Sequence, residues 1–255
     1  MTAVLPVHNR AAVRASAPSP LGSTVDEAPV RPLVAAGIGL VALLTALGPG
    51  TAGWLAGAAF GAALVALLGA AAGRAGVVAL GPADLVTLTR AVLVGGVAAL
   101  VADGLVTGSV PLGVLVPLAG VALALDFVDG RVARRTGTVS ALGARFDMEV
   151  DAVALLVLSI QAAVVLGPWT LAIGLMRYAY VAASRVLPWL AGPLPTRRSA
   201  KAVAAAQGVA LLAAVSGLLP AAASVAVVAL TLVALTWSFG QSVRWLLRHR
   251  PAARV

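Results

Sequence analysis

Long apolar stretches separated by short turn-like segments make up most of the chain after residue 31. Each is close to the length of about 20 residues that an α-helix needs to cross a bilayer. Gly, Pro and charged residues separate them, as in "GPGT", "GRAG" and "RRTGT". The pattern predicts eight transmembrane helices, at 32–49, 52–73, 84–104, 110–130, 142–165, 168–187, 202–219 and 221–244. We therefore expect an all-α integral membrane protein.

The composition supports a membrane environment and excludes several classes of site. Hydrophobic residues make up 61% of the chain, the mean hydropathy is +1.03, and charged residues make up only 11%. The net charge is +9, but the basic residues stand singly between apolar runs. They do not form the basic face of a nucleic-acid-binding protein, so we expect membrane lipids and no nucleic acid as partners. Because the chain contains no cysteine, disulfides and thiolate metal sites are excluded.

Basic residues occur in alternate connections between the predicted helices. They precede the first helix and follow the second, fourth, sixth and eighth, whereas the connections near residues 50, 105, 166 and 219 contain neither Lys nor Arg. With eight helices, all the basic connections fall on one side, which is typically the cytoplasmic side. The pattern predicts a protein of the cytoplasmic (plasma) membrane with both termini in the cytoplasm.

The chain divides by composition into a helical core and smaller flanking parts. In the hairpin of the first two helices, Gly53, Gly57 and Gly61 recur at a four-residue spacing that lets helices approach closely. We interpret this spacing as ordinary helix packing rather than a dedicated dimer face. The predicted parts are a disordered, Pro- and Ser-rich cytoplasmic tail (1–30), an accessory transmembrane hairpin (31–75), a core (76–247) and a basic C-terminal tail (248–255).

Residues 126–152 contain five of the chain's nine acidic residues. Asp126 and Asp129 are three residues apart at the end of the fourth predicted helix, so they share one helical face. Asp147 and Asp151 are four residues apart at the start of the fifth and share a face likewise. A short turn joins these two helices and makes them antiparallel neighbours. We therefore expect four carboxylates to converge at the cytoplasmic side of the membrane.

Four carboxylates at one point repel one another unless a cation lies among them. An all-oxygen donor set favours Mg²⁺ or Mn²⁺ over zinc, and two such ions suit a phosphate-transfer site. Gly130 and Ala133 leave space beside the acids, Gly143 does so one turn before Asp147, and Arg134 offers a planar fork to phosphate oxygens. Arginines nearby in the hairpin could instead pair with the acids, but such pairing does not explain two evenly spaced acid pairs flanked by small residues.

The pattern Asp126-x2-Asp129-Gly130-x2-Ala133-Arg134-x8-Gly143-x3-Asp147-x3-Asp151 resembles the signature of the CDP-alcohol phosphatidyltransferases of class I, with every fixed position filled. The stretch "DLVTLTR" is similar to the family's first-helix pattern, in which Thr87 and Arg90 match and Asp84 replaces the usual Asn. The resemblance covers residues 84 to about 245 and implies a six-helix core with the signature on its second and third helices. The first hairpin lies outside it.

The resemblance implies a chemistry and a set of roles. Members transfer a phosphatidyl or related phosphoalcohol group from a CDP-linked donor, here CDP-diacylglycerol, to an alcohol, and release CMP in phospholipid biosynthesis. Homodimers are usual among them. By this similarity Asp126, Asp129, Asp147 and Asp151 would bind Mg²⁺ or Mn²⁺, and Asp151 would also act as general base. The residues implied to bind CDP and phosphate are Gly130, Ala133, Arg134, Gly143, Thr87 and Arg90.

Other charged residues are candidates for binding the acceptor alcohol. Arg177 lies in the interior of the sixth predicted helix, where it needs an anionic partner or a wet cavity. An acceptor pocket for an anionic alcohol would use Arg177, Arg185, Arg198 and Lys201, although positive-inside anchoring explains some of them equally well. Glu149 lies about 200° around its helix from Asp147 and Asp151, so we expect it to contact a neighbouring helix. Residue 152 is Ala, where relatives that use glycerophosphate or inositol phosphate often carry a basic residue.

Two other functions use acidic clusters in membranes. A cation-coupled transporter would place its charges near the bilayer midplane, with broken helices or inverted repeats. The sequence shows no internal repeat, and the predicted cluster lies at one interface. Polyprenyl-transferring enzymes also use Asp-rich metal sites, but with different motifs. Release of CMP from a CDP-linked donor separates the first hypothesis from both.

Overall fold

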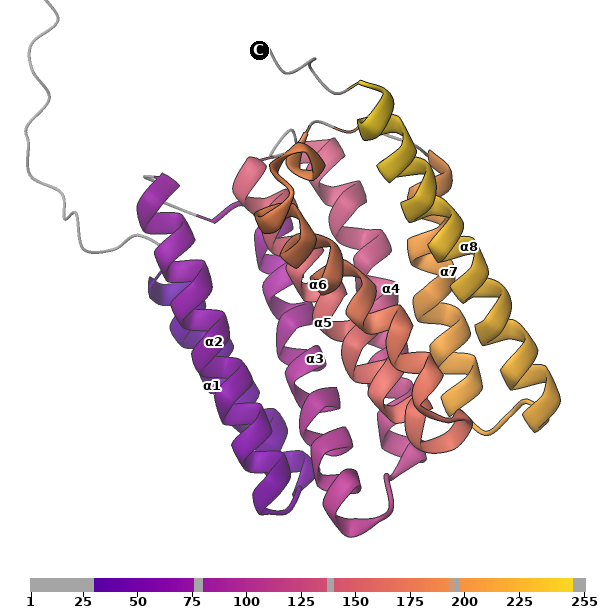
Figure 1. Ribbon diagram of the computed structural model, residues 1–255. Helices are drawn as coiled ribbons and strands as arrows, with labels where there is room; N and C mark the ends of the chain where they lie inside the picture. The colour runs from indigo at the N-terminus through magenta and orange to yellow at the C-terminus, as the bar shows by residue number, and fades with distance from the viewer. Residues whose placement is uncertain (1–29, 76–79, 137–139, 193, 195–197, 250–255) are drawn as a thin grey trace, which may run out of the picture.

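A computed structural model of the chain describes residues 30–75, 80–136, 140–192, 194 and 198–249 (Figure 1). Within them the secondary structure is helical, with no strand, which confirms the predicted fold class. The eight α-helices are α1 (Val30–Leu47), α2 (Thr51–Ala75), α3 (Pro82–Thr107), α4 (Leu112–Thr136), α5 (Ala141–Leu166), α6 (Leu171–Val186), α7 (Arg198–Val215) and α8 (Ala221–Arg248), with short 3-10 turns at Pro168–Thr170 and Pro188–Ala191.

Several helix ends differ by a few residues from the prediction, for local reasons. Helix α1 ends at Leu47 because Gly48 adopts a left-handed conformation (φ 59°), which is common just after a helix. Gly108 (φ 77°) ends α3 in the same way. Helix α7 begins and ends four residues earlier than predicted, and Gly217 (φ 73°) follows it closely. The predicted helix 168–187 is divided, since a 3-10 turn precedes α6.

Among the residues that the structure describes, five helices are long and apolar enough to cross a membrane, namely α1, α2 up to Arg74, α3, α5 and α8. Two others contribute shorter apolar segments, Leu112–Val128 of α4 and Ala202–Val215 of α7. Length and composition therefore indicate an integral membrane protein, as the sequence predicts.

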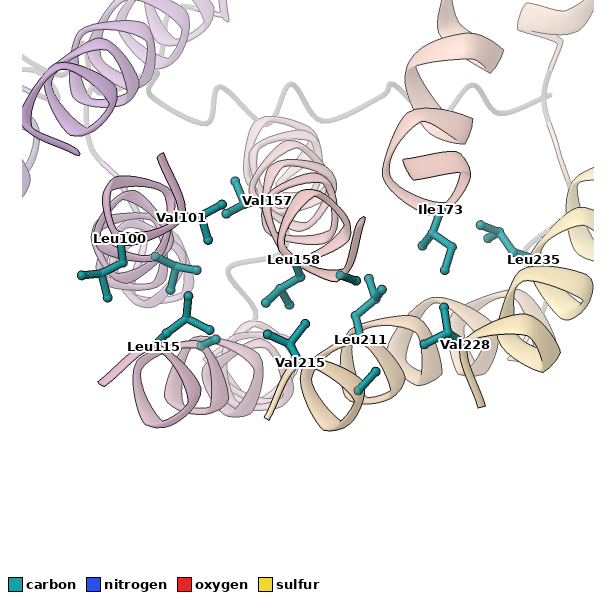
Figure 2. Packing of buried hydrophobic residues seen from close by; sticks show 14 residues of the cluster. Leu100, Val101, Leu115, Val157, Leu158, Ile173, Leu211, Val215, Val228 and Leu235 are labelled. Atoms are coloured by element: carbon teal, nitrogen blue, oxygen red, sulfur yellow. The ribbon is translucent and has the colours of Figure 1, made fainter. Parts of the chain in front are cut away.

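Helix α3 is the centre of the arrangement. It packs against α4 and α5 on one side and against the α1–α2 hairpin on the other, while α7 and α8 pair at the far edge of the bundle (Figure 1). The largest buried cluster joins α3, α4, α5, α7 and α8 through residues such as Leu100, Leu115, Leu158 and Leu211 (Figure 2). A second cluster joins the hairpin to α3 and α5. These apolar contacts hold α3, α4 and α5 side by side.

The helix ends that carry the basic residues lie together. Figure 1 shows the end of α4, the start of α5, the end of α6, the start of α7 and the end of α8 at the upper end of the bundle. The prediction of a single basic side requires this arrangement. Which side faces the cytoplasm stays a prediction.

The glycines of α2 pack against the same chain, as predicted. A Cβ on Gly53 would lie 2.8 Å from the backbone oxygen of Ala99 in α3 and 2.6 Å from Cβ of Pro49. A Cβ on Gly57 would lie 2.6 Å from a methyl carbon of Leu44 in α1. Glycine at these positions therefore lets α2 pack closely against both α1 and α3.

Replacing Gly53 by Ala tests this contact. The new methyl group meets a backbone oxygen that cannot move aside, so we expect a loss of about 1–3 kcal/mol in the free energy of unfolding. The matched control is Gly69→Ala in the same helix, because a Cβ there has no neighbour within 4 Å. This control is expected to gain about 0.5–1 kcal/mol, since Ala is the better helix former. Unfolding in detergent micelles measures both, and equal effects of the two changes would contradict the packing.

Candidate functional site

The starts of α3 and α5 are fixed by hydrogen bonds at their first turns. Oδ2 of Asp84 accepts a hydrogen bond from the backbone N–H of Gly81 at 2.9 Å and so caps α3. Ser140 precedes α5, and its Oγ accepts a hydrogen bond from the N–H of Gly143 at 2.8 Å. Both are standard ways of satisfying free N–H groups at a helix start. They set where the functional side chains of α3 and α5 enter the bundle.

Gly143 is the point where α5 meets the start of α3. A Cβ on Gly143 would collide with Oδ1 of Asp84, whose side chain is buried. Glycine at this position therefore leaves room for the Asp84 carboxylate between the two helices. We expected Gly143 to leave space beside Asp147, and the structure places Asp84 in the position that its Cβ would take. The role of Gly143 in binding CDP stays a prediction.

Three of the predicted acids converge. Asp126 comes from α4, and Asp147 and Asp151 come from successive turns of α5. Each can offer a carboxylate oxygen such that the three oxygens lie within 4.8 Å of one another. The side chains are 29%, 36% and 43% exposed, respectively, so they line an accessible site. Asp129 lies in the penultimate turn of α4, but its side chain is outside the described part of the structure.

The guanidinium group of Arg90 lies among these carboxylates. Its Nη1 donates to Oδ1 of Asp126 at 2.5 Å, and its Nη2 donates to Oδ1 of Asp147 at 2.6 Å and to Oδ1 of Asp151 at 2.9 Å. Nη2 also lies 3.2 Å from the carbonyl oxygen of Asp147. The Arg90 side chain is only 2% exposed. Charge-assisted hydrogen bonds from one arginine thus join α3 to α4 and α5.

The cluster carries more negative than positive charge, because three carboxylates surround one guanidinium. A small cavity extends from Arg90, Asp126 and Asp151 into the bundle, where its walls are apolar and include Val94 and Ala122. Apolar walls lower the local dielectric constant and strengthen the attraction for cations. The donors are oxygens only, which is the set that Mg²⁺ and Mn²⁺ prefer. The residues present therefore fit a divalent metal ion.

The remaining predicted donor-binding residues are placed only in part. Thr87 lies one turn before Arg90 in α3, is buried, and donates to the carbonyl oxygen of Ala83 at 3.2 Å. Gly130, Ala133 and Arg134 lie in the last turns of α4, and their side-chain positions are outside the described part of the structure. Their predicted contacts with CDP and phosphate stay predictions.

Arg177 has an anionic partner on the neighbouring helix. Its Nη2 donates to Oε1 of Glu149 at 2.6 Å, which joins α6 to α5 and confirms that Glu149 contacts a neighbouring helix. Gly174 allows this approach, because a Cβ there would lie 2.6 Å from Cα of Leu156. The pair lies on the side of α5 that faces away from Asp147 and Asp151.

The other three candidate acceptor-binding residues are not brought into contact with the acids among the described side chains. Arg185 is exposed in the last turn of α6. Arg198 and Lys201 lie in the first turn of α7, with side chains outside the described part of the structure.

The ion pairs of Arg90 were not anticipated from the sequence. The resemblance implies that Arg90 binds phosphate, and the sequence offers the nearby arginines of the α4–α5 hairpin as partners for the acids. The sequence nevertheless contains a signal for the observed pairing. A single arginine inside an apolar helix needs an anionic partner, and this holds for Arg90 as it does for Arg177.

Comparison with known families identifies the chain. The sequence model of the CDP-alcohol phosphatidyltransferase family matches residues 80–238. No curated protein and no solved structure matches the chain. Because the family match covers more than half of the chain, the protein belongs to the CDP-alcohol phosphatidyltransferase family. Members are enzymes that transfer a phosphoalcohol group from a CDP-alcohol, and they generally depend on a metal ion.

The family match covers the helices that carry the acid cluster. It begins just before α3 and ends within α8, so it contains the acid cluster and leaves the α1–α2 hairpin outside. Membership favours the enzyme over the cation-coupled transporter considered from the sequence.

The Glu149–Arg177 pair can be tested by a double-mutant cycle. Glu149→Ala, Arg177→Ala and the double variant are compared by their free energies of unfolding in micelles. Both side chains are partly exposed, so we expect a coupling energy of about 0.6 kcal/mol, in the usual range for polar contacts between membrane helices. Additive effects of the two single changes would show that the pair does not join α5 to α6.

Proposed function

We propose that this protein transfers a phosphatidyl group from CDP-diacylglycerol, or a related phosphoalcohol from another CDP-linked donor, to an alcohol, with release of CMP, as a step in phospholipid biosynthesis. The observation that carries the proposal is the convergence of Asp126, Asp147 and Asp151 around Arg90, within the residues that the family match covers. Acidic side chains can bind metal ions, and an arginine beside them can contact phosphate oxygens. Such a site suits a reaction at an anionic diphosphate.

Asp126, Asp129, Asp147 and Asp151 would hold a pair of Mg²⁺ or Mn²⁺ ions. When bound, these ions would neutralise charge on the diphosphate and on the CMP leaving group. The three described carboxylates support this role because their oxygens lie close together and are partly exposed.

Asp151 is the general base of the proposed reaction. It takes the proton of the acceptor hydroxyl as that oxygen forms a bond to the donor phosphorus. The phosphorus–oxygen bond to CMP breaks in the same displacement, and CMP leaves. The 43% exposure of the Asp151 side chain makes it accessible to an acceptor. Thr87, Arg90, Gly130, Ala133, Arg134 and Gly143 bind the CDP and phosphate parts of the donor.

The position of the cluster suits a lipid donor. Asp147 and Asp151 lie in the first turns of α5, and Asp126 lies toward the end of α4, so the site is near one end of the bundle. The same end carries the basic helix ends (Figure 1). We propose that this end faces the cytoplasm from the plasma membrane, as do both termini, and that the acyl chains of the donor stay in the bilayer. Residues 76–247 form the catalytic core, 31–75 the accessory hairpin, and 1–30 and 248–255 the tails.

The acceptor is an anionic alcohol in this proposal, such as a sugar or polyol phosphate. Arg177, Arg185, Arg198 and Lys201 form its pocket. The exposed Arg185 at the end of α6 supports access from the water side. Ala152 is buried and offers no charge, which argues against acceptors that need a basic residue at that position.

Asp147→Ala tests the metal site. The variant loses a carboxylate from the cluster, so we expect the rate of CMP release from CDP-diacylglycerol with Mg²⁺ or Mn²⁺ and a panel of acceptors to fall at least about a hundredfold. The matched control is Asp103→Ala, which removes an acid from the opposite end of α3 and is expected to keep the activity.

Normal turnover by correctly inserted Asp147→Ala protein would contradict the metal assignment. Absence of CMP release by the wild-type protein with every donor and acceptor would contradict the proposed reaction itself.

Arg185→Ala tests the acceptor pocket. If Arg185 binds an anionic acceptor, its removal should raise KM for that acceptor about tenfold, the loss of one charge-assisted contact, and leave KM for the donor unchanged. Arg244→Ala, which removes an exposed arginine near the end of α8, is the control. Equal KM values for wild type and Arg185→Ala would remove Arg185 from the pocket.

A further inference from the structure

We infer that Arg90 is an internal cation that competes with the divalent metal ion for the acid cluster and thereby sets the affinity of the site for metal. The inference rests on the metal site proposed above and goes beyond it. Arg90 gives one hydrogen bond to each of the three carboxylates that would bind the metal, at 2.5, 2.6 and 2.9 Å.

The burial of Arg90 explains why its partners are these acids. A guanidinium group that is 2% exposed within an apolar helix is stable only with anionic partners. The three acids in turn repel one another unless a positive charge lies between them. Arg90 therefore stabilises the metal-free protein by neutralising part of the cluster.

The same contacts oppose metal binding. Each hydrogen bond occupies one of the two oxygens of a carboxylate that would bind the metal ion, and two cations held by the same three carboxylates repel each other. We therefore expect Arg90 to lose at least one of these hydrogen bonds when a metal ion binds to the three acids.

The donor offers Arg90 a new partner. A CDP-linked donor carries an anionic diphosphate, and the planar fork of a guanidinium group matches phosphate oxygens. The hydrogen bonds to the acids and the phosphate contact expected from the family pattern are then two successive states of one side chain. By linkage, binding of a diphosphate to Arg90 raises the affinity of the cluster for metal, and metal binding makes Arg90 available to the diphosphate.

Binding of Mn²⁺ without any nucleotide tests the competition. Mn²⁺ is titrated into the full-length, metal-free protein in nanodiscs, and the free ion is measured by electron paramagnetic resonance. Arg90→Gln removes the competing charge, so we expect it to bind Mn²⁺ about tenfold more tightly than wild type. The control is Arg244→Gln, which removes an exposed arginine near the end of α8 and should leave Mn²⁺ affinity unchanged.

A second variant tests the competition if Arg90→Gln does not fold. Arg90→Lys keeps one positive charge but has a single ammonium group in place of the fork, and we expect a smaller increase in Mn²⁺ affinity. Thermal unfolding provides an independent readout. In chelator, both Arg90 variants should unfold at a lower temperature than wild type, and Mn²⁺ should raise their midpoints by more than it raises that of wild type.

The outcomes separate this inference from the proposed metal site. If Asp147→Asn abolishes Mn²⁺ binding but both Arg90 variants bind Mn²⁺ no more tightly than wild type, the competition is wrong and the metal site stands. If neither the wild-type protein nor an Arg90 variant binds Mn²⁺, the metal site is wrong and the competition falls with it.

Discussion

The hydrogen bonds of one buried guanidinium group to three carboxylates are the interaction on which the rest of the site depends. Arg90 belongs to α3, Asp126 to α4, and Asp147 and Asp151 to α5, so the charges join three helices at one depth. Apolar packing holds these helices side by side but does not by itself determine which turns face one another (Figure 2). A buried charge has few alternative partners in a membrane, and this scarcity makes the register of the three helices specific.

Helix α5 carries acidic residues on two opposite sides, and each side contacts a different helix. Asp147 and Asp151 face Arg90, whereas Glu149, about 200° around the helix, pairs with Arg177 of α6. Movement of α6 would therefore act on α5 and on the acids that α5 carries. The start of α5 also contacts α3, because the carboxylate of Asp84, in the first turn of α3, packs directly against Gly143. The acids thus stand on a helix that is supported at its start and along its opposite side.

Much of this arrangement could be predicted from the sequence, since apolar length and acid spacing are local properties. The eight helices and the convergence of Asp126, Asp147 and Asp151 followed from periodicity and a short connection. The pairing of Arg90 and the contact of Gly143 with Asp84 could not be obtained in this way, because each joins residues more than 30 positions apart. A glycine in a pattern indicates a close approach but not the partner. Helix ends shifted where glycines adopted positive φ, as at Gly48 and Gly108.

We propose that the acids around Arg90 bind the metal ions of this CDP-alcohol phosphatidyltransferase. Anomalous scattering from crystals grown with Mn²⁺ can test this assignment, because it locates the ion without assuming its ligands. We expect an anomalous peak within coordination distance of Asp126, Asp147 and Asp151, with the guanidinium group of Arg90 moved away from at least one of these carboxylates. A crystal saturated with Mn²⁺ that shows no peak at these three residues would contradict it.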